Sequence, residues 1–398
     1  MESFEFKPIT NSFTNESIKP KICFACVCKN EEKCILIALE SVYKFIDYWV
    51  ICDTGSTDNT CELITTFFKN KGIDGELFYE PWKDFGHNKT LLFKKCSDKY
   101  SGGNPGSSYI LHFDADDYFV GNLSFIPGKT QYFINVKKKD ILYPCLLLFD
   151  AAFTWRFCGV AHTTIKCLDN PEPTVGYLTD KEYYMYSTPD TGARAMDPKK
   201  YLKDAEKLKQ QFFDTLIDDP DDLNSRSIFY TAQSYRDQGE HLEAIKWYSL
   251  FTKIKDTWIE ELYISFIELG VLYKNIGFDA RKIEESFLSA INIIPDRAEA
   301  YYQLGLHYNQ TRNHKISYTV LRQAKDILLS NVKKKYILFI NERNYEKYLN
   351  DELSVACYWL EKYTEGKLYL LEILHDPDFE YCRQRLLENE NHFKNKLT

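Results

Sequence analysis

The sequence contains no apolar run of the roughly 20 residues needed to cross a membrane, and its polar first 20 residues lack the apolar centre of a secretion signal. It has no basic excess either, since 50 Lys and Arg stand against 58 Asp and Glu, giving a net charge of −8. Binding to nucleic acid needs a basic face, so we expect no nucleic acid partner. Without a secretion signal, the 12 cysteines indicate reduced thiols, and we expect a cytoplasmic protein with no membrane span.

The length of 398 residues is too great for one ordinary core and predicts two or three domains. Between residues 21 and 195, short apolar runs alternate with segments of helical spacing. This alternation predicts an α/β domain with a Rossmann-like, mostly parallel sheet. From residue 196 to residue 398 only helical patterns remain. We therefore expect a leader over residues 1–20, an α/β domain over 21–195 and an all-helical domain over 196–398.

The helical part contains a repeat. Tyr235, Tyr273 and Tyr308 are separated by 38 and 35 residues, each follows a small residue at a fixed distance, and the first two precede a glycine. This spacing is similar to the tetratricopeptide repeat, whose period is about 34 residues. Stacked helix pairs form a concave groove suited to a protein or glycan acceptor. A homo-oligomer (dimerisation) surface or a rigid lid is the alternative use.

Two predicted strands end in acidic residues. Tyr48 to Cys52 leads into Asp53 and a tight turn over residues 54–58, and Tyr109 to Phe113 leads into the acidic run at 114–117. Ligands of parallel sheets bind beyond the carboxyl ends of the strands. Three carboxylates in four residues repel one another unless a cation such as Mg²⁺ or Mn²⁺ neutralises them. The alternatives are a solvated acidic turn and an ordinary strand-to-helix turn.

The two motifs together resemble the family 2 glycosyltransferases, which have a GT-A fold with an early Asp-Gly-Ser-Thr-Asp turn and a later acidic metal motif. Further segments are similar in order along the chain, and the resemblance extends over residues 21 to 275. The segments inside the α/β domain are 27–32, 81–90 and 157–162. Residues 201–206 and 234–237 look like the helical extension of a subgroup fused to tetratricopeptide repeats.

The resemblance implies a metal-dependent enzyme that moves a sugar from a nucleotide-sugar, UDP-sugar above all, to an acceptor hydroxyl with inversion. It also implies a role for each matching residue. Glu31 and Asp53 would bind uracil and ribose, and Asn88 and Lys89 would lie near the phosphates or sugar. Asp114 and Asp116 would hold Mn²⁺ or Mg²⁺ and the nucleotide-sugar, and His162 would complete the metal shell or contact the diphosphate. A structural histidine is the alternative for His162.

The chain departs from the family pattern at two positions. Thr54 replaces the second acid of the early turn, and Thr163 replaces a glutamate that often follows the late histidine. If that glutamate is the catalytic base elsewhere, this chain needs another carboxylate. The candidates are, in order, Asp150, Asp169 and Asp190.

Two other classes of function stay open. Thr163 also favours a catalytically inactive, glycosyltransferase-like adaptor that binds proteins through its helical repeats. A nucleotidyltransferase would need a basic triphosphate-binding loop after the first strand, and Lys29 alone is a poor candidate for such a loop. The identity of the donor sugar and of the acceptor is not encoded in any motif.

Overall fold

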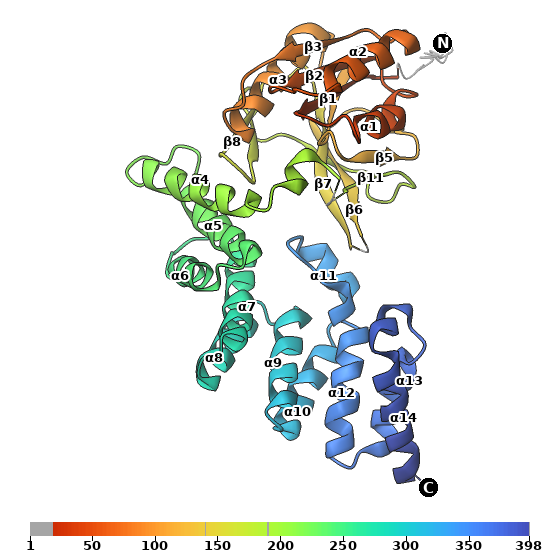
Figure 1. Ribbon diagram of the computed structural model, residues 1–398, viewed down its shortest axis with the longest axis vertical. Helices are drawn as coiled ribbons and strands as arrows, with labels where there is room; N and C mark the ends of the chain where they lie inside the picture. Colours follow the sequence, from red (N-terminus) through yellow and green to blue (C-terminus); the bar gives the residue numbers. More distant parts are fainter. Residues whose placement is uncertain (1–18, 140, 189–190, 398) are drawn as a thin grey trace, which may run out of the picture. The chain divides into compact units, whose positions relative to one another are not determined.

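The computed structural model describes residues 19–139, 141–188 and 191–397 (Figure 1). The predicted leader lies almost entirely outside the described residues. The chain divides into two compact units. The sheet unit runs to Phe157 and resumes over Ile165–Ala193, and the helical unit comprises Cys158–Thr164 and the chain from Arg194 onward. The boundary between the α/β domain and the helical domain was predicted at residue 196. No local pattern indicated that the short segment at 158–164 belongs to the helical unit.

The described part of the sheet unit contains one nine-stranded mixed sheet and one two-stranded sheet. The order in the large sheet is β3-β2-β1-β4-β7-β6-β11-β5, with β10 beside β6. Its strands are β1 (Lys21–Cys28), β2 (Tyr48–Asp53), β3 (Gly75–Tyr79), β4 (Ser108–His112), β5 (Tyr118–Val120), β6 (Gln131–Lys138), β7 (Ile141–Asp150), β10 (Val175–Tyr177) and β11 (Tyr184–Tyr186). The small sheet pairs β8 (Trp155–Cys158) with β9 (Thr164–Cys167).

The first four strands are parallel, as the alternation of strands and helices predicted. β1 pairs in parallel with β2 on one side and with β4 on the other, and β3 extends the sheet beyond β2. β7 then runs antiparallel to β4. The chain therefore builds outward in opposite directions from β1, which makes the carboxyl ends of β1 and β4 a topological switch point, the place where open α/β sheets bind ligands.

Helices cover both faces of the parallel strands. They are α1 (Ile35–Val42), α2 (Thr60–Lys71) and α3 (Phe85–Tyr100). Side chains alternate along a strand. Phe24 and Cys26 of β1 therefore pack with α1 and α2, whereas Cys23 and Ala25 pack with α3 on the opposite face. Each large apolar side chain buried there stabilises the fold by about 1.5–3 kcal/mol, which fixes the strand ends that carry polar residues.

Local signals explain where two of these helices begin and end. The side chain of Asp84 accepts a hydrogen bond from the backbone N–H of His87 at 2.7 Å and so caps the start of α3. α2 ends at Gly72, which has φ of +67°. That left-handed conformation is strained for residues with a Cβ and typical of a glycine after a helix. The two signals set the length of the connections on either side of β3.

The helical unit consists of helices joined by short turns. Successive helices pack as pairs, namely α5 with α6, α7 with α8, α9 with α10 and α12 with α13. The α-helices are α4 (Lys200–Asp214), α5 (Asn224–Gln238), α6 (His241–Phe251), α7 (Ile259–Asn275), α8 (Ala280–Ile293), α9 (Ala298–Gln310), α10 (His314–Lys325), α11 (Leu329–Lys335), α12 (Lys347–Trp359), α13 (Tyr363–Ile373) and α14 (Arg383–Leu397). Short 3₁₀ turns are η1 (Ala193–Met196), η2 (Glu342–Asn344) and η3 (Pro377–Cys382).

Equivalent packing contacts confirm that the helical part is a repeat. Gly270 of α7 lies against the ring of Phe287 in α8, and a Cβ added at that glycine would come within 2.5 Å of the ring. Gly305 of α9 lies against Leu321 of α10 in the same way, and an added Cβ would overlap it. A small residue on the first helix thus lets the second helix approach closely in both pairs. In the part of the chain that the structure describes, no helix is both long and apolar enough to span a bilayer.

Candidate functional site

The acidic loop, residues 114–117, follows β4 at the switch point. Asp114 is exposed, Asp116 is half-buried and Asp117 is 8% exposed. The backbone N–H of Asp117 donates to the carbonyl of Asp114 at 3.1 Å, which closes the loop into a turn. The predicted position of these carboxylates, directly beyond the carboxyl end of a buried parallel strand, is therefore confirmed.

A second segment fastens the acidic loop from the other side. The backbone N–H of Thr188 donates to Oδ1 of Asp117 at 2.9 Å, and its hydroxyl donates to the carbonyl of Asp116. Gly192 lies so close to the side chain of Asp116 that an added Cβ would overlap the carboxylate. Sequence reasoning missed both contacts. The only local signal was a run of turn-forming residues at 187–192.

The charges of the acidic loop act on one another. The pKa of Asp117 is raised to about 7, first because the carboxyl group is buried and then because the charges of Asp114 and Asp116 disfavour another anion. The backbone N–H of Thr188 opposes this effect but does not cancel it. Burial disfavours charge of either sign, but the charges of Asp114 and Asp116 would attract a cation to the loop.

Lys89 of α3 lies beside the acidic loop. Its Nζ is 3.1 Å from Oδ1 of Asp114, and its side chain is 14% exposed. The structure thus brings together two of the residues that the family resemblance singled out. A lysine in this position can reach a phosphate oxygen next to the carboxylate, because its ammonium group is held at the same strand end.

Glu31 follows β1 and shares this edge of the sheet. Its carboxylate accepts hydrogen bonds from the backbone N–H of Ala193 at 3.1 Å and from the Cys34 thiol at 3.1 Å. The pKa of Glu31 is raised, chiefly by burial, and the charges of Asp58 and Asp114 add to the shift. β1 pairs in parallel with β4, so Glu31 and the acidic loop follow neighbouring strand ends, although the carboxylate of Glu31 already has hydrogen-bond donors.

Asp53 is held inside its own turn. It is 6% exposed, and its carboxylate oxygens accept from the backbone N–H groups of Gly55 and Ser56 at 3.1 Å. The Cys28 thiol lies 4.0 Å from Oδ1 of Asp53. These bonds give Asp53 the role of shaping the strand-to-helix turn, which was the alternative interpretation of this motif, and its contact with ribose stays a prediction.

Asn88 likewise holds backbone in place. Its side chain is fully buried, accepts from the N–H of Lys83 at 3.1 Å and donates to the carbonyl of Pro81 at 3.2 Å. The residue fixes the loop that leads into α3 and so positions its neighbour Lys89. A direct contact between the Asn88 side chain and the donor would require these bonds to break.

The prediction of Asp150 as the first candidate base is wrong, because the sheet topology places this residue far from the acidic loop. Because β7 runs antiparallel to β4, Asp150 pairs with Tyr109 near the start of β4, about 16 Å along the strand from Asp114. Asp150 is 2% exposed and accepts from the N–H groups of Gly106 and Ala152 at 2.7 and 3.0 Å. Its carboxylate therefore holds a loop at the opposite edge of the sheet.

The two other candidate bases differ in what the structure describes. Asp169 accepts a hydrogen bond from the backbone N–H of Thr154 and so fastens the strand-to-strand connection next to β8. Asp190 lies outside the described residues. The catalytic base is therefore unassigned, and Asp190 stays a prediction.

His162 belongs to the helical unit and has a left-handed φ of +47°. Its ring stacks on Tyr230 with centroids 4.1 Å apart, and its carbonyl accepts from Nε of Arg226 at 2.9 Å. Burial by its neighbours and the charges of Arg226 and Arg194 lower the pKa of His162, which keeps the imidazole neutral. These contacts favour the structural alternative, and its role as a metal ligand stays a prediction.

The described residues contain no group of three or more His, Cys, Asp or Glu side chains placed to hold a metal ion by themselves. Asp114 and Asp116 supply two carboxylates on one loop. An ion bound there would have to complete its shell with oxygens of a ligand and with water, which is how Mg²⁺ commonly binds next to phosphates.

No protein-family model and no curated protein matches the sequence. Among solved structures, the chain is similar to a tetratricopeptide repeat protein from Parabacteroides merdae, with 16% identity over 50% of this chain and 67% of that chain and a TM-score of 0.36. It is also similar to BtubC from P. vanneervenii (12% identity, 52% and 84% coverage, TM-score 0.39). A third similar structure is a thermophilic TPR protein from Thermus thermophilus, with 12% identity over 50% of this chain and 91% of that chain and a TM-score of 0.31. Because these TM-scores lie below 0.5, the assignment of the repeats rests on the contacts of Gly270 and Gly305.

Proposed function

We propose that the sheet unit is a GT-A-like domain and that the protein is a metal-dependent glycosyltransferase. It would move a sugar from a UDP-sugar to a hydroxyl of a protein or glycan acceptor, with inversion. The observation that carries the proposal is the position of the acidic loop at the carboxyl end of β4, beside the end of β1, where an open α/β sheet binds its ligand.

The residues present fit a hard divalent cation. Asp114 and Asp116 would hold Mn²⁺ or Mg²⁺ through carboxylate oxygens, the donor type that these ions prefer. The charges of Asp114 and Asp116, which add to the raised pKa of Asp117, would be neutralised in part by the ion. When bound, the ion would neutralise the negative charge of the departing diphosphate.

The side chains around the loop would divide the remaining work. Lys89, held 3.1 Å from Asp114, would contact a phosphate oxygen of the donor. Glu31 would accept a hydrogen bond from the nucleoside. Thr188 and Gly192 hold the acidic loop in place, so that the donor meets a preformed site. Removal of the proton from the acceptor hydroxyl is left to a carboxylate such as Asp190.

The direct test is the thermal stability of the full chain with UDP and Mn²⁺, added together and separately. A ligand that binds only the folded state raises the melting temperature by mass action. The proposal expects a larger shift with both ligands than with either alone, and hydrolysis of a UDP-sugar when a panel of donors is supplied. Equal shifts with and without the metal would remove the metal from the proposal.

The variant Asp116→Asn tests the site itself, because it keeps the shape of the side chain and removes its charge. We expect turnover to fall at least about 100-fold, which corresponds to roughly 3 kcal/mol of lost stabilisation. Asp98→Asn is the matched control, since Asp98 lies on α3 with 61% of its side chain exposed. Full activity of the Asp116 variant would refute the assignment.

The alternative function is a glycosyltransferase-like adaptor without turnover. It is favoured by Thr163, which replaces the family glutamate, and by the commitment of Asp150 to a structural role. The same experiments distinguish the two. An adaptor would show neither a metal-dependent shift with UDP nor donor hydrolysis.

A further inference from the structure

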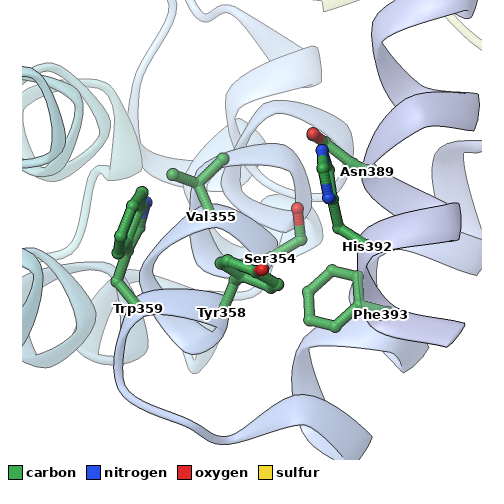
Figure 2. Close-up of a pocket in the computed structure, with 7 residues that line it drawn as sticks. All are labelled: Ser354, Val355, Tyr358, Trp359, Asn389, His392 and Phe393. Carbon is green, nitrogen blue, oxygen red and sulfur yellow. The ribbon is translucent and has the colours of Figure 1, made fainter. Parts of the chain in front are cut away.

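A cavity of about 370 Å³ opens between α12 and α14 in the helical unit (Figure 2). The cavity is lined on one side by four residues of α12, namely Ser354, Val355, Tyr358 and Trp359, and on the other by three residues of α14, namely Asn389, His392 and Phe393. The two helices are separated in the sequence by α13 and η3. The cavity is therefore built by the tertiary packing of the last helices, and it lies within the range of volumes typical of small-ligand sites.

Aromatic rings form most of the wall. Trp359 is 63% exposed, and the ring of His314 stacks on it with centroids 5.3 Å apart and an interplanar angle of 11°. One face of the indole is thus covered, and the exposed area belongs to the rest of the ring. Tyr358 meets Trp359 and Phe393 edge-on, at 5.7 and 5.4 Å between centroids. Phe393 is 1% exposed and also lines the cavity.

Polar atoms converge on the same space. Figure 2 shows the Asn389 and His392 side chains across the cavity from Trp359. Within the described ranges, neither side chain, nor the Tyr358 hydroxyl or the Trp359 indole N–H, makes a hydrogen bond to another residue. The cavity thus offers an amide, an imidazole, a hydroxyl and an indole N–H around flat apolar faces.

The lining carries no Asp, Glu, Lys or Arg among the residues that the structure describes. A phosphate, a carboxylate or an ammonium group entering the cavity would lose water without gaining a charged partner, which is costly. The lining therefore selects a neutral ligand. A purely apolar ligand fits poorly as well, because it would displace water from the half-buried amide of Asn389 without replacing its hydrogen bonds.

We propose that this cavity binds a neutral saccharide. A sugar ring has a face of C–H groups that packs on an indole or phenol ring and a rim of hydroxyls that both donate and accept hydrogen bonds. Trp359 and Tyr358 match the first feature, and Asn389 and His392 match the second. The binding itself is independent of catalysis. The interpretation of the saccharide as part of a glycan acceptor rests on the proposed function.

The test uses the full chain and a panel of neutral disaccharides, namely maltose, cellobiose, lactose and chitobiose. Saturation-transfer NMR and tryptophan fluorescence are recorded without nucleotide or metal. We expect at least one disaccharide to bind with roughly millimolar affinity. Trp359→Ala should weaken binding at least about tenfold, because it removes the stacking face. Asn389→Ala should weaken it less.

Trp258→Ala is the matched control, because Trp258 is another partly exposed tryptophan of the helical unit, 38% exposed and at the start of α7. Equal binding by wild type and the Trp258 variant, with loss in a folded Trp359 variant, supports the proposal. Absence of binding by every disaccharide, or equal binding by the Trp359 variant, overturns it. These results are read without donor or metal, so failure here is distinct from failure of the UDP and Mn²⁺ test.

Discussion

The two units place clustered acidic side chains in opposite surroundings. In the helical unit, the guanidinium of Arg297 is fully buried and lies 3.3 Å from Glu260 and 3.0 Å from Glu299. In the sheet unit, three carboxylates stand together in the acidic loop, and the pKa of Asp117 is raised to about 7. This difference distinguishes acidic residues that stabilise the fold from acidic residues that could bind a ligand. Acids with a buried cation between them complete a core. In the acidic loop, Lys89 lies beside Asp114 at the rim, and the charges of Asp114 and Asp116 add to the burial that raises the pKa of Asp117, so we propose a further cation from outside.

The helical cluster is satisfied from several elements. Nη1 of Arg297 also donates to the carbonyl of Leu338 at 3.0 Å, and the carboxylate of Glu260 accepts from the N–H groups of Ile337 and Leu338 at 3.0 and 2.8 Å. Glu260 lies on α7, so this network ties that helix to the segment after α11. A buried pair of this kind adds little net stability by itself but is costly to break from one side.

The largest expected effect follows from removing the cation of that cluster. Arg297→Met leaves Glu260 and Glu299 buried without their partner, so the free energy of unfolding should fall by about 3–5 kcal/mol. Urea denaturation followed by circular dichroism measures it. Arg281→Met is the control, because 85% of the Arg281 side chain is exposed. Equal losses in the two variants would contradict the comparison.

Removing an acid that serves architecture in the sheet unit comes next. Asp150→Ala leaves the N–H groups of Gly106 and Ala152 without an acceptor and should cost about 1–3 kcal/mol of stability. Donor hydrolysis per folded molecule should be unchanged, since Asp150 lies at the edge opposite the acidic loop. If Asp150→Ala lost turnover while keeping full stability, Asp150 would again be a candidate for the catalytic base. Asp98→Ala serves as the exposed control.

The helical unit also predicts a pH dependence. Burial raises the pKa of Glu261 to about 7, despite the nearby charge of Arg226. Between pH 4.5 and 7 the folded state then binds more protons at this site than the unfolded state. The contribution of Glu261 to stability is therefore complete at low pH and is lost as the pH rises through 7.

Glu261→Gln should remove that contribution and flatten the decline in the free energy of unfolding by about 1–3 kcal/mol over this range. Urea melts of wild type and variant at several pH values give the difference directly. Glu243→Gln, at a side chain that is 45% exposed, should leave the curve unchanged. A wild-type curve that coincides with the Glu261→Gln curve would disprove the assignment.

The smallest expected change in stability is that of Asp116→Asn, and it contrasts most strongly with the large loss expected for Arg297→Met. Removing one charge from the crowded acidic loop by Asp116→Asn should leave the metal-free stability unchanged or raise it by up to about 1 kcal/mol. Thermal melts in the presence of a chelator measure it. A substantial destabilisation would mean that the carboxylates of the loop are structural, like those around Arg297.

The parts of the fold that follow from local pattern were predicted well. The apolar run at 22–27 and the acids after residue 113 predicted a buried strand and a polar strand end, because burial and alternation act over a few residues. The spacing of Tyr235, Tyr273 and Tyr308 predicted the helix pairs for the same reason. The GT-A assignment and the donor remain predictions, since they rest on resemblance.

The rest depends on contacts between distant segments. Asp150 followed an apolar strand just as Asp114 did, but the sequence does not state the direction of a strand, and the antiparallel run of β7 moved Asp150 to the other edge. Asp53 and Asn88 matched a family pattern, yet their hydrogen bonds to nearby backbone became visible only in three dimensions. The cavity is formed by side chains of α12 and α14, and the neighbouring Tyr358 and Trp359 were its only sign in the sequence.

Gly192 is a position at which one substitution would change the geometry of the acidic loop. The residue is buried against the side chain of Asp116, and it leaves that carboxylate just enough room. A single methyl group at this position would push the carboxylate aside while every charge of the chain stayed the same. Ligand binding at the loop would then be lost through a change of shape without a change of charge. The contribution of geometry to binding could in this way be separated from the contribution of charge.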